Sequence, residues 1–187
     1  MSAMKLRSLF VALLMVASAA GCSKPPPKTT IQQFMEDQVN PAGDLLFRSV
    51  VDISDAKGVR LEAPQTAAQW QAVEDKLTIL HDTSDVITAK GIKVAPPGFK
   101  SEHPPVESSP EWIQQQVDAH PDDFKQRALR LTRTADVAMQ AAQAHDARGL
   151  QRALNGVDHA CESCHLHYFY PNDKRAWQAA KEDGGVD

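Results

Sequence analysis

The sequence predicts an all-α fold, an antiparallel up-down four-helix bundle with its most distinctive motif near the end of the last helix. Three observations support this prediction. Apolar residues recur at steps of three and four in successive segments, which is the spacing of one face of a helix. Hydrophobic residues make up 42% of the 187 residues and aromatic residues only 6%, while alanine and glutamine are plentiful. The sequence contains no evident internal repeat or strand-like alternation.

The first 21 residues have the pattern of a secretory signal peptide. Lys5 and Arg7 precede an uncharged apolar run, and small residues follow that run. The run is too short and wrongly flanked for an ordinary transmembrane helix. A buried N-terminal helix is the alternative interpretation. We expect residues 1–21 to be removed, so that the folded domain begins after them.

Residues 19–22, AAGC, resemble a bacterial lipobox, with alanine at a position where leucine is more common. The resemblance implies cleavage before Cys22 and attachment of lipid to its thiol, and simple secretion is the alternative. Each buried methylene of the acyl chains contributes about 0.8 kcal/mol, so several chains make a stable membrane anchor. Ser23 favours an anchor in the outer membrane, facing the bacterial periplasm, over one in the inner membrane. Residues 22–30 then form a lipid-attached tether that its prolines keep extended.

A single helical domain is expected over residues 31–171. Its first helix spans about 31–53, where apolar residues keep a helical phase. Pro41 lies inside this pattern and removes a backbone donor, so we expect a kink there. A turn-like connection over 54–65, with a glycine and a proline, joins the first helix to the second.

The second helix is expected over about 66–90. Thr66 and Gln69 have the spacing of a capping box, which marks its start. The following stretch, residues 92–109, is rich in proline, glycine and serine and is predicted to be a long loop. The sequence of this loop does not indicate a function.

Two further helices complete the predicted bundle. One spans about 110–146 with a break near Pro121, and the last spans about 147–170. Residues 172–187 are polar and are predicted to be a C-terminal tail. The last helix has the clearest inner seam, at steps of 4, 3, 4, 3 and 4 residues: Leu150, Leu154, Val157, Cys161, Cys164 and Tyr168.

The motif C-x-x-C-H occupies residues 161–165, CESCH, on this last helix. This spacing is typical of a c-type haem attachment site. The thiols of Cys161 and Cys164 can each form a thioether with one haem vinyl group, and His165 can ligate the iron. Both cysteines belong to the inner seam, so they are expected to project toward the core. One covalent haem c is therefore the predicted cofactor.

Two cysteines at this spacing can also bind zinc, act as a redox dithiol or form a structural disulfide. Zinc needs two more soft ligands, and no second C-x-x-C exists in the chain. A redox dithiol usually opens a helix after a strand, and no such pattern lies nearby. A disulfide in an exported adhesin-like or structural bundle is the third alternative. The predicted export favours haem, because such attachment occurs outside the cytoplasm.

The arrangement resembles the cytochrome c′ (class II cytochrome c) family over roughly residues 30–170. Residues 35–47, MEDQVNPAGDLLF, are similar to an M-x-x-x-V-x-P-A-x-D-x-x-W stretch of related exported cytochromes, with Phe47 in place of tryptophan. Trp70 before a long second helix, the AAQAHD run at 141–146 and the C-x-x-C-H-x-x-Y pattern are also similar. The resemblance implies the same fold and the same class of cofactor.

The resemblance also implies roles for the iron ligands. His165 takes the proximal position, and the residue facing the iron from the other side comes from the first helix. Met35 is the candidate for this distal position, and a methionine there makes the iron six-coordinate. His81 on the second helix is the rival candidate, while core packing is the alternative role for Met35. Phe169 stands where many members of the family have a basic residue.

These observations predict a mono-haem cytochrome that transfers electrons in the bacterial cell envelope. We see no acid–base pair or nucleophile–base arrangement that argues for an enzyme. A net charge of −4 shows no basic footprint for nucleic acid. The expected partners are redox proteins of the envelope and the membrane through Cys22, and many family members are homodimers. The alternative function is a haem sensor or scavenger of nitric oxide or carbon monoxide with five-coordinate iron.

Overall fold

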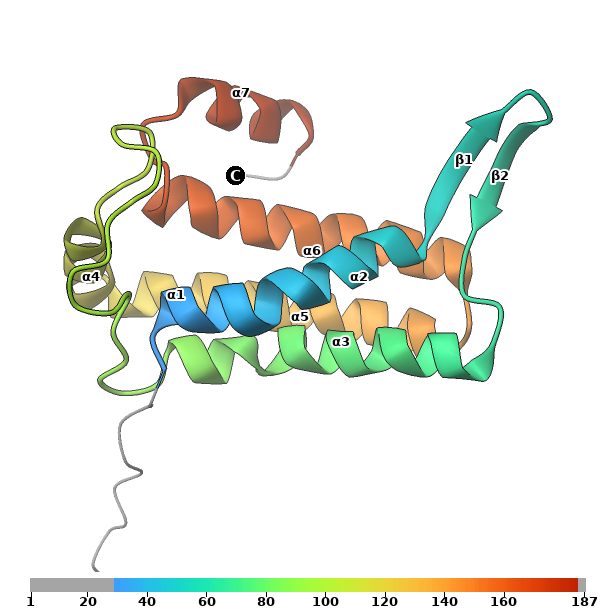
Figure 1. Cartoon of the computed structure of the whole chain (residues 1–187), viewed down its shortest axis with the longest axis horizontal. Coiled ribbons are helices and arrows are strands. Elements are labelled where there is room, and N and C mark those ends of the chain that lie inside the picture. Colours follow the sequence, from blue (N-terminus) through green and yellow to red (C-terminus); the bar gives the residue numbers. More distant parts are fainter. Residues whose placement is uncertain (1–28, 185–187) are drawn as a thin grey trace, which may run out of the picture.

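The computed structural model describes residues 29–184, and this part of the chain is mostly helical with a small two-stranded sheet (Figure 1). The predicted signal peptide, the lipidation at Cys22 and most of the predicted tether lie outside the described residues. The helical elements are α1 (Ile31–Phe34), the π-helix η1 (Met35–Val39), α2 (Asn40–Ser49), α3 (Ala67–Ile87), α4 (Pro110–Ala119), α5 (Pro121–Gln143), α6 (Ala147–Tyr168) and α7 (Lys174–Glu182). The strands are β1 (Val51–Asp55) and β2 (Gly58–Glu62).

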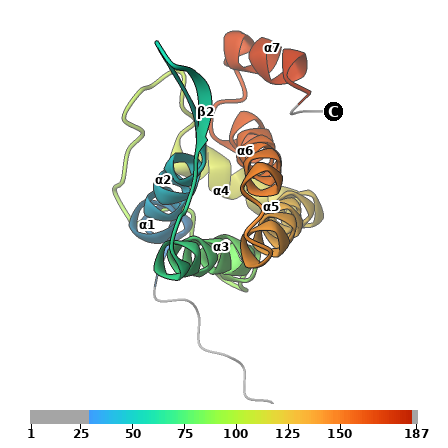
Figure 2. The same cartoon turned by 90° about the vertical axis from the view of Figure 1, so that its right-hand side faces the viewer.

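The long helices lie side by side along the longest axis of the molecule, and α3, α5 and α6 alternate in direction (Figure 1). α5 packs against both α3 and α6, and α2 packs against α3. The view along these helices shows them arranged around a common centre (Figure 2). The core fills this centre with side chains that are almost wholly buried: Ala42, Leu46, Val73, Leu77, Leu80, Ala135, Ala138, Ala142, Leu150 and Val157.

The elements α1, η1 and α2 follow one another without a break and are here called the first helical stretch. This stretch begins with a capping box and contains a π-turn. Thr30 Oγ1 accepts a hydrogen bond from the Gln33 backbone N–H (3.2 Å), and Gln33 Oε1 accepts one from the Thr30 N–H (3.1 Å). The Asn40 N–H then donates to the Met35 carbonyl, the i→i−5 bond of a π-helix. Pro41, which cannot donate, follows at once. The π-turn therefore ends just before the proline at which a kink was predicted.

The prediction of a helix over 31–53 is wrong at its C-terminal end, because α2 ends at Ser49 and a hairpin follows. β1 and β2 pair antiparallel, with Val51 opposite Glu62 and Asp55 opposite Gly58. Apolar residues alternate with polar ones in both strands, the period of an extended chain. The expectation of an all-α fold, with a simple turn over 54–65, is therefore incorrect for this segment.

The hairpin projects from one end of the helices (Figure 1). Polar side-chain contacts tie it to α6. Arg148 Nη1 donates to the carboxylate of Asp52 (2.9 Å), and the side-chain amide of Gln151 donates to the same carboxylate (3.1 Å). These bonds lower the pKa of Asp52 below its usual value. Charged side chains therefore secure an element that buries little apolar surface.

The remaining helices lie close to their predicted positions. α3 begins at Ala67, after a capping box formed by Thr66 and Gln69, and ends at Ile87 rather than at residue 90. α4 and α5 are separated only by His120, next to the proline at which a break was predicted. α6 ends at Tyr168, two residues before its predicted end.

The C-terminal region contains a helix where a polar tail over 172–187 was predicted. The Asp173 carboxylate accepts hydrogen bonds from the first backbone N–H groups of α7, which is why a helix starts there. Trp177 donates its indole N–H to the Pro171 carbonyl (3.1 Å), and its ring contacts the ring of His167 with centroids 5.1 Å apart. One aromatic side chain thus docks an otherwise polar helix on the end of α6.

Candidate functional site

Cys161 and Cys164 lie on the same side of α6 because residues three apart on a helix are neighbours. Both are partly buried and neither forms a disulfide. Cys161 packs against the main core together with Met35, and Cys164 packs in a second apolar cluster that also contacts Met35. Both thiols therefore face the interior between α6 and the first helical stretch.

Burial raises the pKa of both thiols, that of Cys161 to about 12 and that of Cys164 to about 11. The neighbouring thiol and the carboxylates of Asp158 and Glu162 raise the pKa of Cys161 further, while Arg127 partly offsets the effect at Cys164. Both groups are consequently neutral thiols at ordinary pH. Such buried thiols are poor nucleophiles and do not resemble the low-pKa cysteines of redox enzymes.

A cavity of about 350 Å³ opens beside Cys164. This volume lies within the range of pockets that hold small organic ligands. The walls come from the first helical stretch, from α3, α4, α5 and α6, and from the segments next to them. The lining residues outside the connecting segment 92–109 are Ile31, Gln32, Met35, Glu36, Asn40, Ile87, Pro110, Ile113, Phe124, Cys164, His165, Tyr168, Phe169 and Tyr170.

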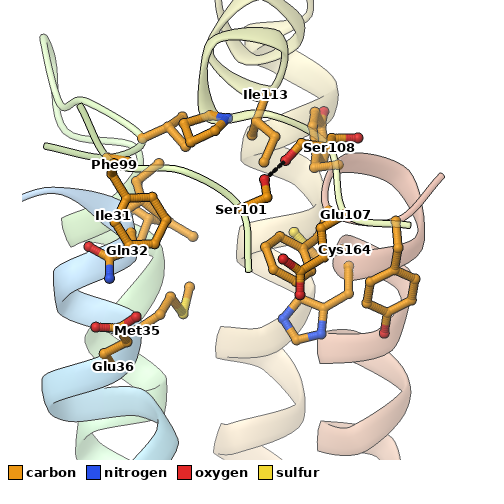
Figure 3. Close-up of a pocket in the computed structure, with 18 of the residues that line it drawn as sticks. Ile31, Gln32, Met35, Glu36, Phe99, Ser101, Glu107, Ser108, Ile113 and Cys164 are labelled. Atoms are coloured by element: carbon orange, nitrogen blue, oxygen red, sulfur yellow. Dashed lines mark hydrogen bonds between the residues drawn. The ribbon is translucent and has the colours of Figure 1, made fainter. Parts of the chain in front are cut away.

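Met35 reaches this cavity from the first residue of the π-turn. Figure 3 shows Met35 on the side of the first helical stretch and Cys164 across the cavity from it. A π-turn within an α-helix is frequent at functional sites, because the extra residue changes the direction of the side chains around it. The fold thus brings the predicted distal candidate and the C-x-x-C-H motif to one cavity.

His165 lines the same cavity at the C-terminal end of α6. The residue is exposed, and its ring lies near those of Phe169 and Tyr170, with centroids 6.2 and 6.0 Å away. The surrounding protein groups reduce the hydration of the imidazole and so lower the pKa of His165, and the carboxylates of Glu162 and Asp158 partly oppose this effect. The neutral imidazole, which is the form that binds metals, is therefore favoured.

The rival candidate, His81, is not among the residues that line the cavity. It lies on α3 with its side chain half-exposed, and Nδ1 donates to the Asp136 carboxylate on α5 at 2.7 Å. His167 is close to His165 in sequence, but its ring packs against Trp177 of α7. The described structure therefore brings Met35, and not His81, to the cavity with His165.

The segment of residues 92–109, here called the roof segment, forms a large part of the cavity wall. Its contributions are Val94, Ala95, Phe99, Ser101, Glu102, Glu107 and Ser108. Ser101 Oγ donates to the carbonyl of Ser108 at 2.6 Å, which closes the segment into a loop (Figure 3). Sequence reasoning assigned this segment no role. The only available signals were its length and its few apolar residues.

Hydrogen bonds fasten the roof segment to three other elements. The N–H groups of Ile31 and Gln32 donate to carbonyls of the segment at 2.9 and 2.8 Å. The Val94 N–H donates to the side chain of Gln114 on α4 (2.9 Å), and the Ser108 N–H donates to the Phe169 carbonyl (2.7 Å). The roof segment therefore bridges the start of the first helix and the end of α6.

The residues present suit a covalently held haem. Cys164 and His165 meet at the cavity with the thioether of Met35, and the walls are largely apolar. Among the lining residues the structure describes, the charged ones are acidic and none is lysine or arginine. The described lining therefore offers no lysine or arginine as a partner for the acidic groups of a haem. Cys161 is not a lining residue, although it and Met35 pack against the same core cluster.

The described residues contain no group of three or more histidine, cysteine, aspartate or glutamate side chains arranged to hold a metal ion. No helix within residues 29–184 has the length and apolar character needed to cross a membrane. Comparison of the chain with protein-family models, with curated proteins and with solved structures gives no match.

Proposed function

We propose that the chain is an exported mono-haem cytochrome of the c type that transfers single electrons in the bacterial cell envelope. The observation that carries this proposal is the meeting of three groups at one cavity. Cys164 and His165 of the C-x-x-C-H motif line it together with Met35, which comes from the opposite end of the described chain. A thiol, an imidazole and a thioether at an apolar cavity form a donor set suited to a haem.

Each residue has a distinct part in this proposal. The thiols of Cys161 and Cys164 would hold a haem covalently, through one thioether each. His165 and Met35 supply a nitrogen and a sulfur donor from the two sides of the cavity. A bound haem supplies an iron that accepts and releases one electron. The apolar walls exclude water, and no bond in a substrate needs to be made or broken.

The finer description of the fold belongs to the same proposal. We regard the first helical stretch, α3, α5 and α6 as an antiparallel four-helix bundle of the cytochrome c′ type, with the hairpin as an insertion after the first helix. Lipid on Cys22 anchors the protein, with the outer membrane favoured, and the domain meets redox partners in the periplasm. Association into homodimers is also proposed from the resemblance.

Covalent haem staining tests the proposal. The full chain is produced in bacteria that carry the c-type haem attachment machinery, and a denaturing gel is stained for haem. We expect haem to stay with the wild-type chain and to be lost from the double variant Cys161→Ala/Cys164→Ala. The control variant Cys22→Ala removes the third thiol, so it should keep the haem but leave the membrane fraction.

Two results would contradict the proposal. One is a wild-type chain without covalent haem under these conditions. The other is haem that remains bound on the denaturing gel after both cysteines of the motif have been replaced. A haem-loaded chain that appears in the soluble fraction even with Cys22 intact would contradict only the anchor.

A further inference from the structure

A polar network joins α5 and α6, and one of its members, Tyr168, lines the cavity. The carboxylate of Asp123, in the first turn of α5, accepts hydrogen bonds from Arg127 Nε (2.9 Å) and Nη2 (3.3 Å). It also accepts one from the hydroxyl of Tyr168 at the end of α6 (2.9 Å). One carboxylate therefore gathers three donors from two helices.

The third nitrogen of the Arg127 guanidinium contacts the helical turn of α6 that contains the C-x-x-C motif. Arg127 Nη1 donates to Ser163 Oγ at 3.0 Å. Ser163 lies between the two cysteines of the motif and is only 3% exposed. Arg127 thus joins Asp123 on its own helix to the buried turn of α6 that carries both thiols.

This pair differs from an ordinary surface ion pair. The side chain of Arg127 is 20% exposed and that of Asp123 50% exposed, so the guanidinium is the better shielded member. Bonding to Arg127 lowers the pKa of Asp123, and both partners are charged at neutral pH. Two-pronged bonds between arginine and a carboxylate have fixed geometry and are stronger than neutral hydrogen bonds.

The charges of this pair matter because of what surrounds the cavity. None of the described residues that line it is lysine or arginine, and Glu36, Glu102 and Glu107 are acidic. Arg127 reaches the motif from outside the cavity, through Ser163. It is therefore a positive charge held against the motif, and Asp123 is its counter-charge.

We propose that Arg127 and Asp123 are a positioning pair that fixes the C-x-x-C-H turn and sets the electrostatic potential at it. This inference rests on the proposed function, because it concerns the midpoint potential of the proposed haem. The oxidised state of a haem carries one more positive charge than the reduced state. A net negative charge nearby favours the oxidised state, and a net positive charge favours the reduced state.

Two charge-neutralising variants should therefore shift the midpoint potential in opposite directions. Arg127→Gln leaves the Asp123 anion without its partner and lowers the potential. Asp123→Asn leaves the Arg127 cation and raises it. Both variants weaken the network and should lower the thermal unfolding temperature. A purely structural role would not produce shifts of opposite sign.

The experiment uses the full haem-loaded chain, titrated with mediators while its absorption spectrum is recorded, and each variant is also melted. Arg127→Lys keeps the charge but loses the planar guanidinium group. The midpoint potential of this variant should therefore stay nearer the wild-type value than that of Arg127→Gln. Its thermal unfolding temperature should still fall. The control Arg133→Gln makes the same charge change at an exposed position of α5 and should shift the potential less.

The outcomes separate the two proposals. Shifts of opposite sign in the two neutralising variants support the pair. Shifts of the same sign, or no shift beyond that of the Arg133 control, overturn it while leaving a haem-loaded wild type intact. A wild type without covalent haem overturns both proposals together.

Discussion

The indole ring of Trp70 lies flat against the imidazole of His145, with ring centroids 4.9 Å apart and planes 9° from parallel. Trp70 is the fourth residue of α3, and His145 lies in the turn between α5 and α6. His145 has a φ of 52°, in the left-handed region that ordinary side chains seldom adopt. The stack therefore lies at a turn whose backbone conformation favours glycine.

The first prediction concerns this turn. His145→Ala keeps the unfavourable φ and loses the stack, so we expect its unfolding free energy to fall by about 1 kcal/mol. His145→Gly also loses the stack but tolerates the φ, so its loss should be smaller. Urea unfolding measures both, with His103→Ala at an exposed position as the control. A glycine variant less stable than the alanine variant would show that the positive φ of residue 145 does not destabilise the fold.

The second prediction concerns the small residues of α5. Ala138 is fully buried in the core, whereas the neighbouring Val137 is 56% exposed. Ala138→Leu adds three carbon atoms where the helices meet, and we expect it to reduce the unfolding free energy by about 1–3 kcal/mol. Val137→Leu enlarges an exposed side chain on the same helix and should change little. Equal effects of the two substitutions in chemical unfolding would contradict close packing at Ala138.

The third prediction concerns pH. Hydrogen bonds from Arg127 and Tyr168 hold the pKa of Asp123 below its usual value in the folded state. The stability that this ionised carboxylate contributes is present above its unfolded pKa and is lost as pH falls through the folded pKa. Wild type should therefore exceed Asp123→Asn in unfolding free energy at neutral pH, and the gap should close as pH falls from about 5 to about 2. If urea unfolding shows that the difference in unfolding free energy stays constant over this pH range, the lowered pKa of Asp123 is contradicted.

The fourth prediction concerns the candidate distal ligand in the haem-loaded protein. Met35→Ala removes the thioether from the cavity, so the oxidised and reduced spectra should change from low-spin to high-spin features. Met139→Ala is the matched control, because Met139 is partly buried against the core but is not a cavity-lining residue. Spectra indifferent to the loss of Met35 would exclude it as a ligand. Fast, stoichiometric binding of carbon monoxide to reduced wild type would favour the gas-binding alternative.

The helices could be predicted from the sequence because their signals are local. Capping residues such as Thr66 and a regular apolar seam mark α3 and α6 without any knowledge of the fold. The hairpin was missed because Val50 and Ile53 fit the helical spacing of the preceding helix. The alternation around Ile53 and Leu61 was the signal that could have revealed it.

The candidate site was predictable only in part. C-x-x-C-H is a local pattern, and Met35 could be proposed from its place in the first helix. The roof segment and the network of Asp123, Arg127 and Tyr168 depend on contacts between distant segments, which one sequence does not reveal. α7 was missed because its only strong packing signal is Trp177 in a polar stretch.

The attachment of the roof segment also bears on the order in which the molecule is assembled. Its hydrogen bonds join it to Ile31 near the start of the described chain and to Phe169 near the end. The cavity is therefore enclosed only after the C-terminal residues have been made and the whole domain has closed. The turn that bears Cys161 and Cys164, by contrast, is a short local segment. Under the proposed function, a haem would reach these thiols most easily on the open chain, so its attachment would precede closure and leave it enclosed.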